Sequence, residues 1–148
     1  MGAGIRAVAV AVIALTGLLS AAGAVAAQVD LAKTLVGTWE GEVKARMLRG
    51  PDAGAELKLI ITSVTQQDGK WIADGRLGGK DGRSAPVKVD IDTSGSKPSL
   101  RFKGASGTDY ALSLFNDKQM AGTATLTTAQ AKSSTGARDR DVILEKKN

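Results

Sequence analysis

Histidine and cysteine are both absent from this chain of 148 residues. Without histidine, the chain lacks the commonest general base and the commonest metal ligand in proteins. Without cysteine, it lacks thiol nucleophiles, disulfide bonds and the usual sulfur ligands of zinc. A Ser-His-Asp triad is therefore excluded, and any catalysis would have to use carboxylate, lysine, serine or tyrosine chemistry.

Aromatic residues are also scarce, at 3% of the chain, and none of them is interleaved with a run of basic residues. The formal net charge is only +5, and the lysines and arginines are spread along the whole chain with acidic residues nearby. This pattern is typical of a solvated surface with a mild positive excess. It does not favour nucleic acid as a partner.

Three stretches resemble chemical motifs only in part. Glu40 and Glu42 share one face of a strand. The other residues of that face are polar or charged, which is typical of the solvent-exposed side of a half-buried strand. Residues 90–96 lack the third acid and the closing Glu of a calcium loop. Residues 75–83 are rich in glycine, but no helix pattern follows them, which favours a hairpin turn. The sequence therefore predicts no catalytic residue, no cofactor and no metal site.

The longest apolar run, residues 7–19, follows a short basic start and leads into a stretch of small residues. This order is typical of a secretory signal peptide, with cleavage after Ala26 and with Ala27 as the alternative. A membrane anchor would need ~20 apolar residues, which is more than this run provides. We therefore expect residues 1–26 to be removed and residues 27–148 to form one exported domain, secreted or periplasmic, without membrane insertion.

Beyond that segment, apolar and polar residues alternate with a period of two, which predicts β-strands with one buried face. Turn residues separate the strands, and connections this short join antiparallel neighbours. Eight such strands can close on themselves and leave no free edge. The predicted fold is an all-β, eight-stranded antiparallel up-and-down β-barrel. Its strands are expected at residues 38–47, 56–64, 70–77, 85–92, 99–104, 108–115, 119–127 and 140–146.

Two segments do not follow the strand pattern. Residues 28–35 place Leu31 and Leu35 at helical spacing, which indicates a single helical turn that plugs one end of the barrel. Residues 127–137 are rich in Ala, Ser and Thr, and we interpret them as a long loop between the last two strands.

The opening Gly37-Thr38-Trp39, placed behind a short helical turn and at the start of an eight-stranded meander, resembles the start of the lipocalins and the wider calycin group of small β-barrels. Thr108-Asp109-Tyr110 also matches a tripeptide found late in many lipocalins. The resemblance implies that a basic residue near the last strand, Arg138 or Arg140, packs across Trp39. The structural plug implied in this way consists of Gly37, Trp39 and Arg140.

An eight-stranded barrel is just wide enough either to be filled by side chains or to hold one small ligand. The inward residues expected here are mostly aliphatic, several are small, and only Ser63 adds an inward polar group. Such walls suit an apolar guest. The ligand-binding candidates are Trp39, Val43, Leu59, Trp71, Val89, Phe102, Tyr110 and Leu112.

Three functions remain open at this point. The first is a non-catalytic exported barrel that binds a small apolar molecule. The second is an exported barrel that binds a protein partner, such as a peptidase inhibitor. The third is a structural or stress-related envelope domain with a filled core, in which both tryptophans serve only as core residues.

Overall fold

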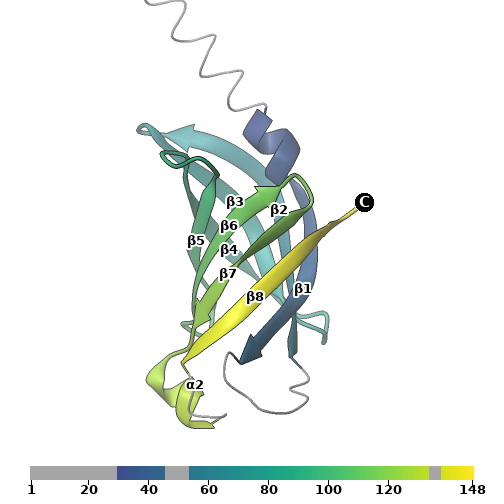
Figure 1. Ribbon diagram of the computed structural model, residues 1–148, viewed down its shortest axis with the longest axis vertical. Helices are drawn as coiled ribbons and strands as arrows, with labels where there is room; N and C mark the ends of the chain where they lie inside the picture. Colours follow the sequence, from purple (N-terminus) through teal and green to yellow (C-terminus); the bar gives the residue numbers. More distant parts are fainter. Residues whose placement is uncertain (1–29, 46–53, 134–137) are drawn as a thin grey trace, which may run out of the picture.

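The computed structural model describes residues 30–45, 54–133 and 138–148, which form one closed β-barrel (Figure 1). Among these residues each strand pairs with the next one along the chain, and β8 returns to pair with β1. The predicted all-β, eight-stranded antiparallel up-and-down barrel is confirmed. The strands are β1 Gly37–Ala45, β2 Ala55–Gln67, β3 Lys70–Gly78, β4 Ser84–Asp92, β5 Ser99–Lys103, β6 Asp109–Asn116, β7 Gln119–Thr125 and β8 Asp139–Lys147.

Two expectations concern residues outside the described part of the chain. The proposed signal peptide, residues 1–26, lies there, and so do residues 46 and 47, at the end of the first expected strand.

The turn between β2 and β3 consists of Asp68 and Gly69, which both have positive φ angles, of 50° and 76°. This is the conformation of a type I′ turn, for which Asp-Gly is a favoured sequence. Gln67 and Lys70 pair directly across the turn. The local sequence therefore sets the register of this hairpin.

The barrel core follows the predicted alternation of apolar and polar residues. In β4, for example, Val87, Val89 and Ile91 are buried while the residues between them are exposed. The buried cluster takes side chains from all eight strands and adds Leu35 from the N-terminal helix. Buried and exposed side chains in the structure thus alternate with the same period of two as the apolar and polar residues in the sequence.

A β-bulge in β2 interrupts the alternation of inward and outward side chains. Because of this bulge, the prediction that Ser63 faces inward is wrong. Ile61 lies opposite Gly75 on β3, but Ser63 lies opposite Asp74, so the strand gains one residue between them. An extra residue moves every following side chain to the other face. Ser63 therefore shares the outer face with Asp74, and Val64 takes the inward position with 4% of its surface exposed.

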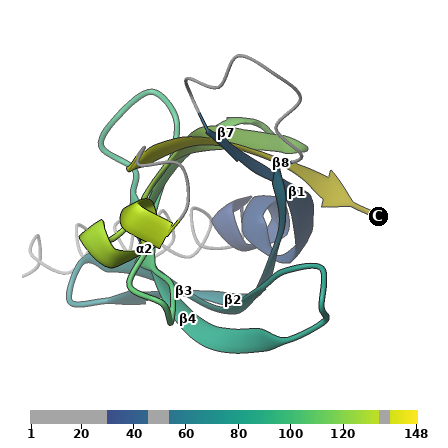
Figure 2. The same cartoon turned by 90° about the horizontal axis from the view of Figure 1, so that it is seen from below.

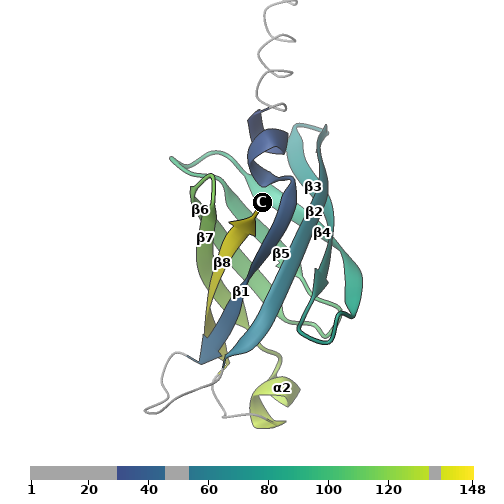
Figure 3. The ribbon, with the colours of Figure 1, turned by 90° about the vertical axis from the view of Figure 1, so that its right-hand side faces the viewer.

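The N-terminal helix, residues 30–35, closes one end of the barrel (Figures 1 and 3). Trp39 is fully buried beneath it, and its indole Nε1 donates a hydrogen bond of 2.9 Å to the carbonyl oxygen of Leu35. Gly37 turns the chain from helix to strand with a φ of 139°, which side-chain-bearing residues rarely adopt.

The cation beside Trp39 is Lys146, so the expected contact with Arg138 or Arg140 is wrong. The Nζ atom of Lys146 lies 5.5 Å from the centroid of the Trp39 ring. In the β1–β8 ladder Trp39 pairs with Lys146, whereas Arg140 pairs with Ala45 at the far end of β1. Six residues of strand, at about 3.3 Å each, separate the two basic side chains.

The opposite end of the barrel carries a short helix, α2 Thr128–Ser133, so the prediction of a loop is wrong for these residues. The backbone N–H of Thr127 donates to Oε1 of Gln130 at 2.8 Å, and the backbone N–H of Gln130 donates to Oγ1 of Thr127 at 3.3 Å. This reciprocal pair is a capping box, which favours a helix start. Residues 134–137 lie outside the described part.

Candidate functional site

A cup of about 570 Å³ opens at the end of the barrel opposite the N-terminal helix. Figure 2 looks at this end, with α2 at its rim and the N-terminal helix visible at the far end of the barrel. The cup lies among the ends of the strands and the β3–β4 and β5–β6 connections. One end of the barrel is therefore plugged, and the other is hollow.

Half of the residues that line the cup are apolar. They are Val43, Ala55, Leu57, Leu77, Ala85, Ala105, Tyr110 and Leu126, and glycines line it at positions 78, 79 and 104. The polar and charged lining residues are Glu56, Asp81, Arg83, Ser106 and Arg140. Apolar walls with a few polar groups are the usual composition of a small-molecule pocket.

Arg140 differs from the other charged residues of the cup, because it lies on the inward face of its strand. It stands two residues before Val142, which is buried, and it pairs with the buried Ala124 of β7. The side chain is half-buried, and its Nε atom is shielded from solvent. By contrast, Glu56, Asp81 and Arg83 are exposed at the rim.

Both charged residues on the inward face of the described strands are basic, and both belong to β8. Lys146 lies at the plugged end, where its Nζ atom donates to the carbonyl oxygens of Thr34 at 2.7 Å and Lys33 at 3.3 Å. Arg140 lies at the open end beside the cup. No inward position of the described strands holds a carboxylate. The inward charged residues of the described strands are therefore both cations, one at each end of β8.

Tyr110 forms part of the cup wall, and its ring stacks on Phe102 with the ring centroids 4.8 Å apart. Burial raises the pKa of Tyr110 above its ordinary value of 10.0. Its phenol therefore stays protonated through the neutral range and remains a hydrogen-bond donor there.

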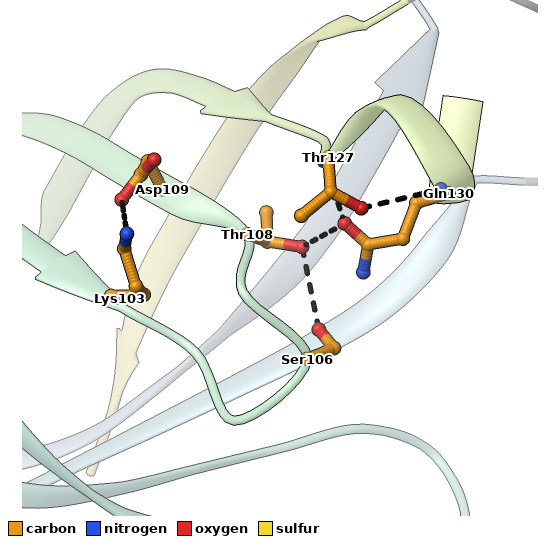
Figure 4. Close-up of polar contacts among 6 residues, drawn as sticks. All are labelled: Lys103, Ser106, Thr108, Asp109, Thr127 and Gln130. Atoms are coloured by element: carbon orange, nitrogen blue, oxygen red, sulfur yellow. Dashed lines mark hydrogen bonds and ion pairs between the residues drawn. The ribbon is translucent and has the colours of Figure 1, made fainter.

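A small polar network fixes α2 to the rim of the cup (Figure 4). The hydroxyl of Thr108, a residue with 3% of its surface exposed, donates to Oε1 of Gln130 at 3.1 Å and lies 3.4 Å from the hydroxyl of Ser106. Next to it, Lys103 and Asp109 form an exposed ion pair of 3.4 Å. One amide oxygen thus caps the helix and also joins it to the β5–β6 connection.

The candidate ligand residues divide between the cup and the packed part of the barrel. Val43 and Tyr110 line the cup. The other candidates are buried deeper, with at most 9% of their surface exposed: Trp39, Leu59, Trp71, Val89, Phe102 and Leu112. Arg140, which was expected to be part of the plug, lines the cup instead. Its inward position follows from the alternation in β8, because Arg140 lies two residues before the buried Val142.

The small inward residues leave less room than the sequence suggests. A Cβ atom added at Gly41 would collide with the backbone carbonyl of Ile143 on β8, and one added at Gly122 would collide with that of Ala111 on β6. Neighbouring backbone therefore fills the space that these glycines open. The cup accordingly lies at the mouth of the barrel, beyond the level of these two glycines.

Two other hollows lie on the outer wall, and charged side chains contribute to the lining of both. One of about 400 Å³ is lined in part by Asp90, Arg101, Lys103 and Asp109, and one of about 650 Å³ in part by Glu40, Glu42, Glu56, Lys58, Glu145 and Lys147. Within the described residues, no group of three or more acidic side chains is placed to hold a metal ion. Of these three concavities in the described part of the chain, the cup is the one at the open end of the barrel, and half of its lining residues are apolar.

No helix within residues 30–45, 54–133 and 138–148 is long and apolar enough to cross a membrane. None of the known protein-family models matches this chain, and no curated protein sequence is significantly similar to it. The fold and the cup are therefore the basis on which a function can be assigned.

Proposed function

We propose that this chain is a non-catalytic, lipocalin-like barrel that is exported through its N-terminal signal peptide and binds a small apolar molecule in the cup. The observation that carries the proposal is the asymmetry of the barrel interior. The end beneath the N-terminal helix is packed around Trp39, whereas the other end holds an apolar cup of about 570 Å³.

The size of the cup supports a small guest. Pockets for small molecules usually measure about 300–1,000 Å³ and have mainly apolar walls. Because the barrel is packed from Leu59 and Leu112 to Trp39, a guest would occupy the outer part of the barrel and could not extend along its whole axis.

The alternative of a protein-binding barrel has less support in the described residues. A large, continuous exposed apolar patch would mark a protein interface. The large apolar side chains exposed there are Val36, Phe115 and Ile143, which belong to three different segments of the chain. The Phe115 ring, moreover, is covered on one face by the Nζ atom of Lys97 at 4.9 Å.

Titration with the neutral fluorescent probe N-phenyl-1-naphthylamine tests the proposal. Saturable binding to one site is expected, because the probe is small, apolar and brighter in a dry environment. Ala85→Trp should abolish the binding, because Ala85 faces the cup. Ala111→Trp adds the same bulk to the exposed outer face of β6 and should leave binding unchanged.

Circular dichroism and thermal melting of both variants would establish that they fold. If the wild-type chain shows no saturable binding, or if folded Ala85→Trp binds as well as wild type, the cup is not a binding site. Probe binding that is lost only in Ala111→Trp would place the site on the outer wall.

A further inference from the structure

We propose that the cup selects apolar guests that carry a carbonyl oxygen and that the phenol of Tyr110 donates a hydrogen bond to this oxygen. The inference rests on the proposed function and adds to it the chemical class of the ligand: an apolar molecule with a ketone or ester group.

Tyr110 lies at the floor of the cup. It is the first inward residue of β6 after the β5–β6 connection, in which residues 104–106 line the cup. The next inward residue of the strand, Leu112, has 1% of its surface exposed and belongs to the packed core. Tyr110 therefore lies where the hollow end of the barrel meets the packed part, and a guest that fills the cup would reach it.

The end of the Tyr110 ring that carries the hydroxyl lies beside the cup. A Cβ atom placed on Gly104 would be 3.4 Å from Cε2 of Tyr110, the carbon next to the one that bears the hydroxyl. The same position is 3.3 Å from Cδ2 of Leu77. Gly104 and Leu77 both line the cup. A side chain at position 104 would press on this edge of the ring, so the glycine keeps the edge open.

The faces of the ring have neighbours within the barrel. One face stacks on Phe102, with the ring planes 12° apart. On the other neighbouring strand, Tyr110 pairs with Ala124, which is fully buried. We therefore expect Tyr110 to meet a guest through its edge and its hydroxyl and not by stacking.

The hydroxyl of Tyr110 makes no hydrogen bond within residues 30–45, 54–133 and 138–148. The other hydroxyl that lines the cup, that of Ser106, lies 3.4 Å from the hydroxyl of Thr108. Because burial raises the pKa of Tyr110, its phenol keeps the proton at neutral pH and can donate it to an acceptor. A guest that expels water but supplies no acceptor would leave this donor unsatisfied, which is costly.

A pair of ligands of the same shape tests the inference. 2-Acetylnaphthalene and 2-isopropenylnaphthalene share one aromatic body, but only the first carries a carbonyl oxygen. Their affinities are measured by displacement of N-phenyl-1-naphthylamine. In Tyr110→Phe the ratio of ketone affinity to alkene affinity should fall about threefold to tenfold, the net effect of one neutral hydrogen bond. Ser106→Ala removes the other hydroxyl of the cup and is the matched control, in which the ratio should stay close to that of the wild type.

Infrared difference spectroscopy of the bound ketone gives a readout that a change in packing alone would not produce. A donated hydrogen bond lowers the stretching frequency of a carbonyl group. The frequency should therefore be lower in the wild-type chain than in Tyr110→Phe, and Ser106→Ala should match the wild type.

An ester extends the test to the second kind of carbonyl. Methyl 2-naphthoate places an ester group on the same aromatic body. A loss of affinity in Tyr110→Phe for either the ketone or the ester, relative to the alkene, supports the proposal, and the larger loss identifies the preferred carbonyl. No loss for either would overturn it.

The possible failures are distinct. If N-phenyl-1-naphthylamine does not bind to the wild-type chain, the proposed function is wrong and this inference falls with it. If the probe binds but the affinity ratios are the same in folded Tyr110→Phe, the cup binds apolar guests and the role of Tyr110 is wrong. An equal loss in Ser106→Ala would also overturn that role. If Tyr110→Phe does not fold, the ketone bound to the wild-type chain still decides, because a carbonyl frequency equal to that in a hydrocarbon solvent would contradict the hydrogen bond.

Discussion

The side chain of Lys146 reaches across the barrel end to the carbonyl oxygen of Thr34, 112 positions earlier in the chain, with a hydrogen bond of 2.7 Å. Its Nζ atom also contacts the carbonyl oxygen of Lys33 at 3.3 Å. These carbonyls belong to the last turn of a helix, where backbone acceptors have no partner within the helix and where a cation is favoured by the helix dipole. One lysine on the last strand therefore fixes the helix that plugs the barrel.

Replacement of this lysine should loosen the plug. We expect Lys146→Met to lower the free energy of unfolding by about 1–2 kcal/mol, because the helix loses its bonded cation while the apolar part of the side chain is kept. Lys147→Met, at the exposed neighbouring position, is the control and should leave stability nearly unchanged. Urea melts of both variants measure this. Equal effects in the two variants would contradict the capping role.

Removal of Trp39 should have a much larger effect. Trp39→Ala would empty the space beneath the helix and remove the bond to the Leu35 carbonyl, at a cost of ~3–5 kcal/mol in the free energy of unfolding. This is a large part of the usual total of ~5–15 kcal/mol. Glu40, one residue further on, makes an exposed ion pair of 2.9 Å with Lys58. Glu40→Ala should therefore leave the urea midpoint close to that of the wild type.

This pair of variants also tests the register of β1. A shift by one residue would exchange the two side chains between the core and the solvent. A damaging Glu40→Ala together with a mild Trp39→Ala would mean that the inward face of the first strand is misassigned.

Thr108 should control how firmly α2 is held. A six-residue helix is not stable by itself, so its backbone protection depends on the capping box and on contacts with the rim. Thr108→Val keeps the shape of the side chain but removes the donor to Gln130. We expect faster amide hydrogen exchange in residues 128–133 and faster association and dissociation of the neutral probe.

Thr123→Val, on the outer face of β7, is the matched control and should change neither rate. Unchanged exchange in residues 128–133 of folded Thr108→Val would show that the Thr108–Gln130 bond does not hold the helix.

The phenol of Tyr110 should give the barrel a specific pH dependence. Burial raises its pKa above 10.0 in the folded chain, so the folded state retains the proton more tightly than the unfolded state does. This contribution to stability is complete below pH 10. It decreases as the pH rises from 10 through the folded-state pKa.

Ultraviolet titration measures this effect directly, because the chain has a single tyrosine. The phenolate signal of the folded protein should appear above pH 10 and return to the ordinary value in urea. Tyr110→Phe should remove this part of the alkaline loss of stability. A folded protein that titrates at the ordinary value would show that the ring is solvated.

Much of the fold is visible in the sequence because its signal is local. The alternation of apolar and polar residues in β4 and the Asp-Gly turn after β2 depend only on neighbouring residues. The burial of Trp39 also follows from its spacing to Val43, because residues four positions apart in a strand lie on the same face. These features require no knowledge of which strands lie side by side.

The features that were missed depend on distant contacts or on a single residue. The partner of Trp39 is decided by the register between β1 and β8, which are far apart in the chain, and spacing alone does not distinguish Lys146 from Arg140. The bulge near Ser63 is an insertion of one residue with no sequence marker of its own. The start of α2 did have a signal, the Thr127 and Gln130 capping box, within a tract of small residues.

The cup could not be derived from the strand pattern, because hollow volume depends on the sum of many side chains and on how closely the backbones approach. Gly41 and Gly122 illustrate this. In the sequence they suggest open space inside the barrel, but the backbone of a neighbouring strand occupies that space. Arg140 lines the cup because it lies two residues from the buried Val142 on the same strand, and therefore on the same face of the sheet.

The pairing of β8 with β1 also determines how the barrel can form in time. Seven of its eight strand pairs join neighbours in the chain, but this last pair joins segments about a hundred residues apart. Closing so long a loop carries a large entropic cost, so hairpins should form early and this ladder late. Until it forms, the sheet has two open edges that can pair with another chain. The slow step of folding and the moment of greatest aggregation risk should therefore coincide at the β1–β8 seam.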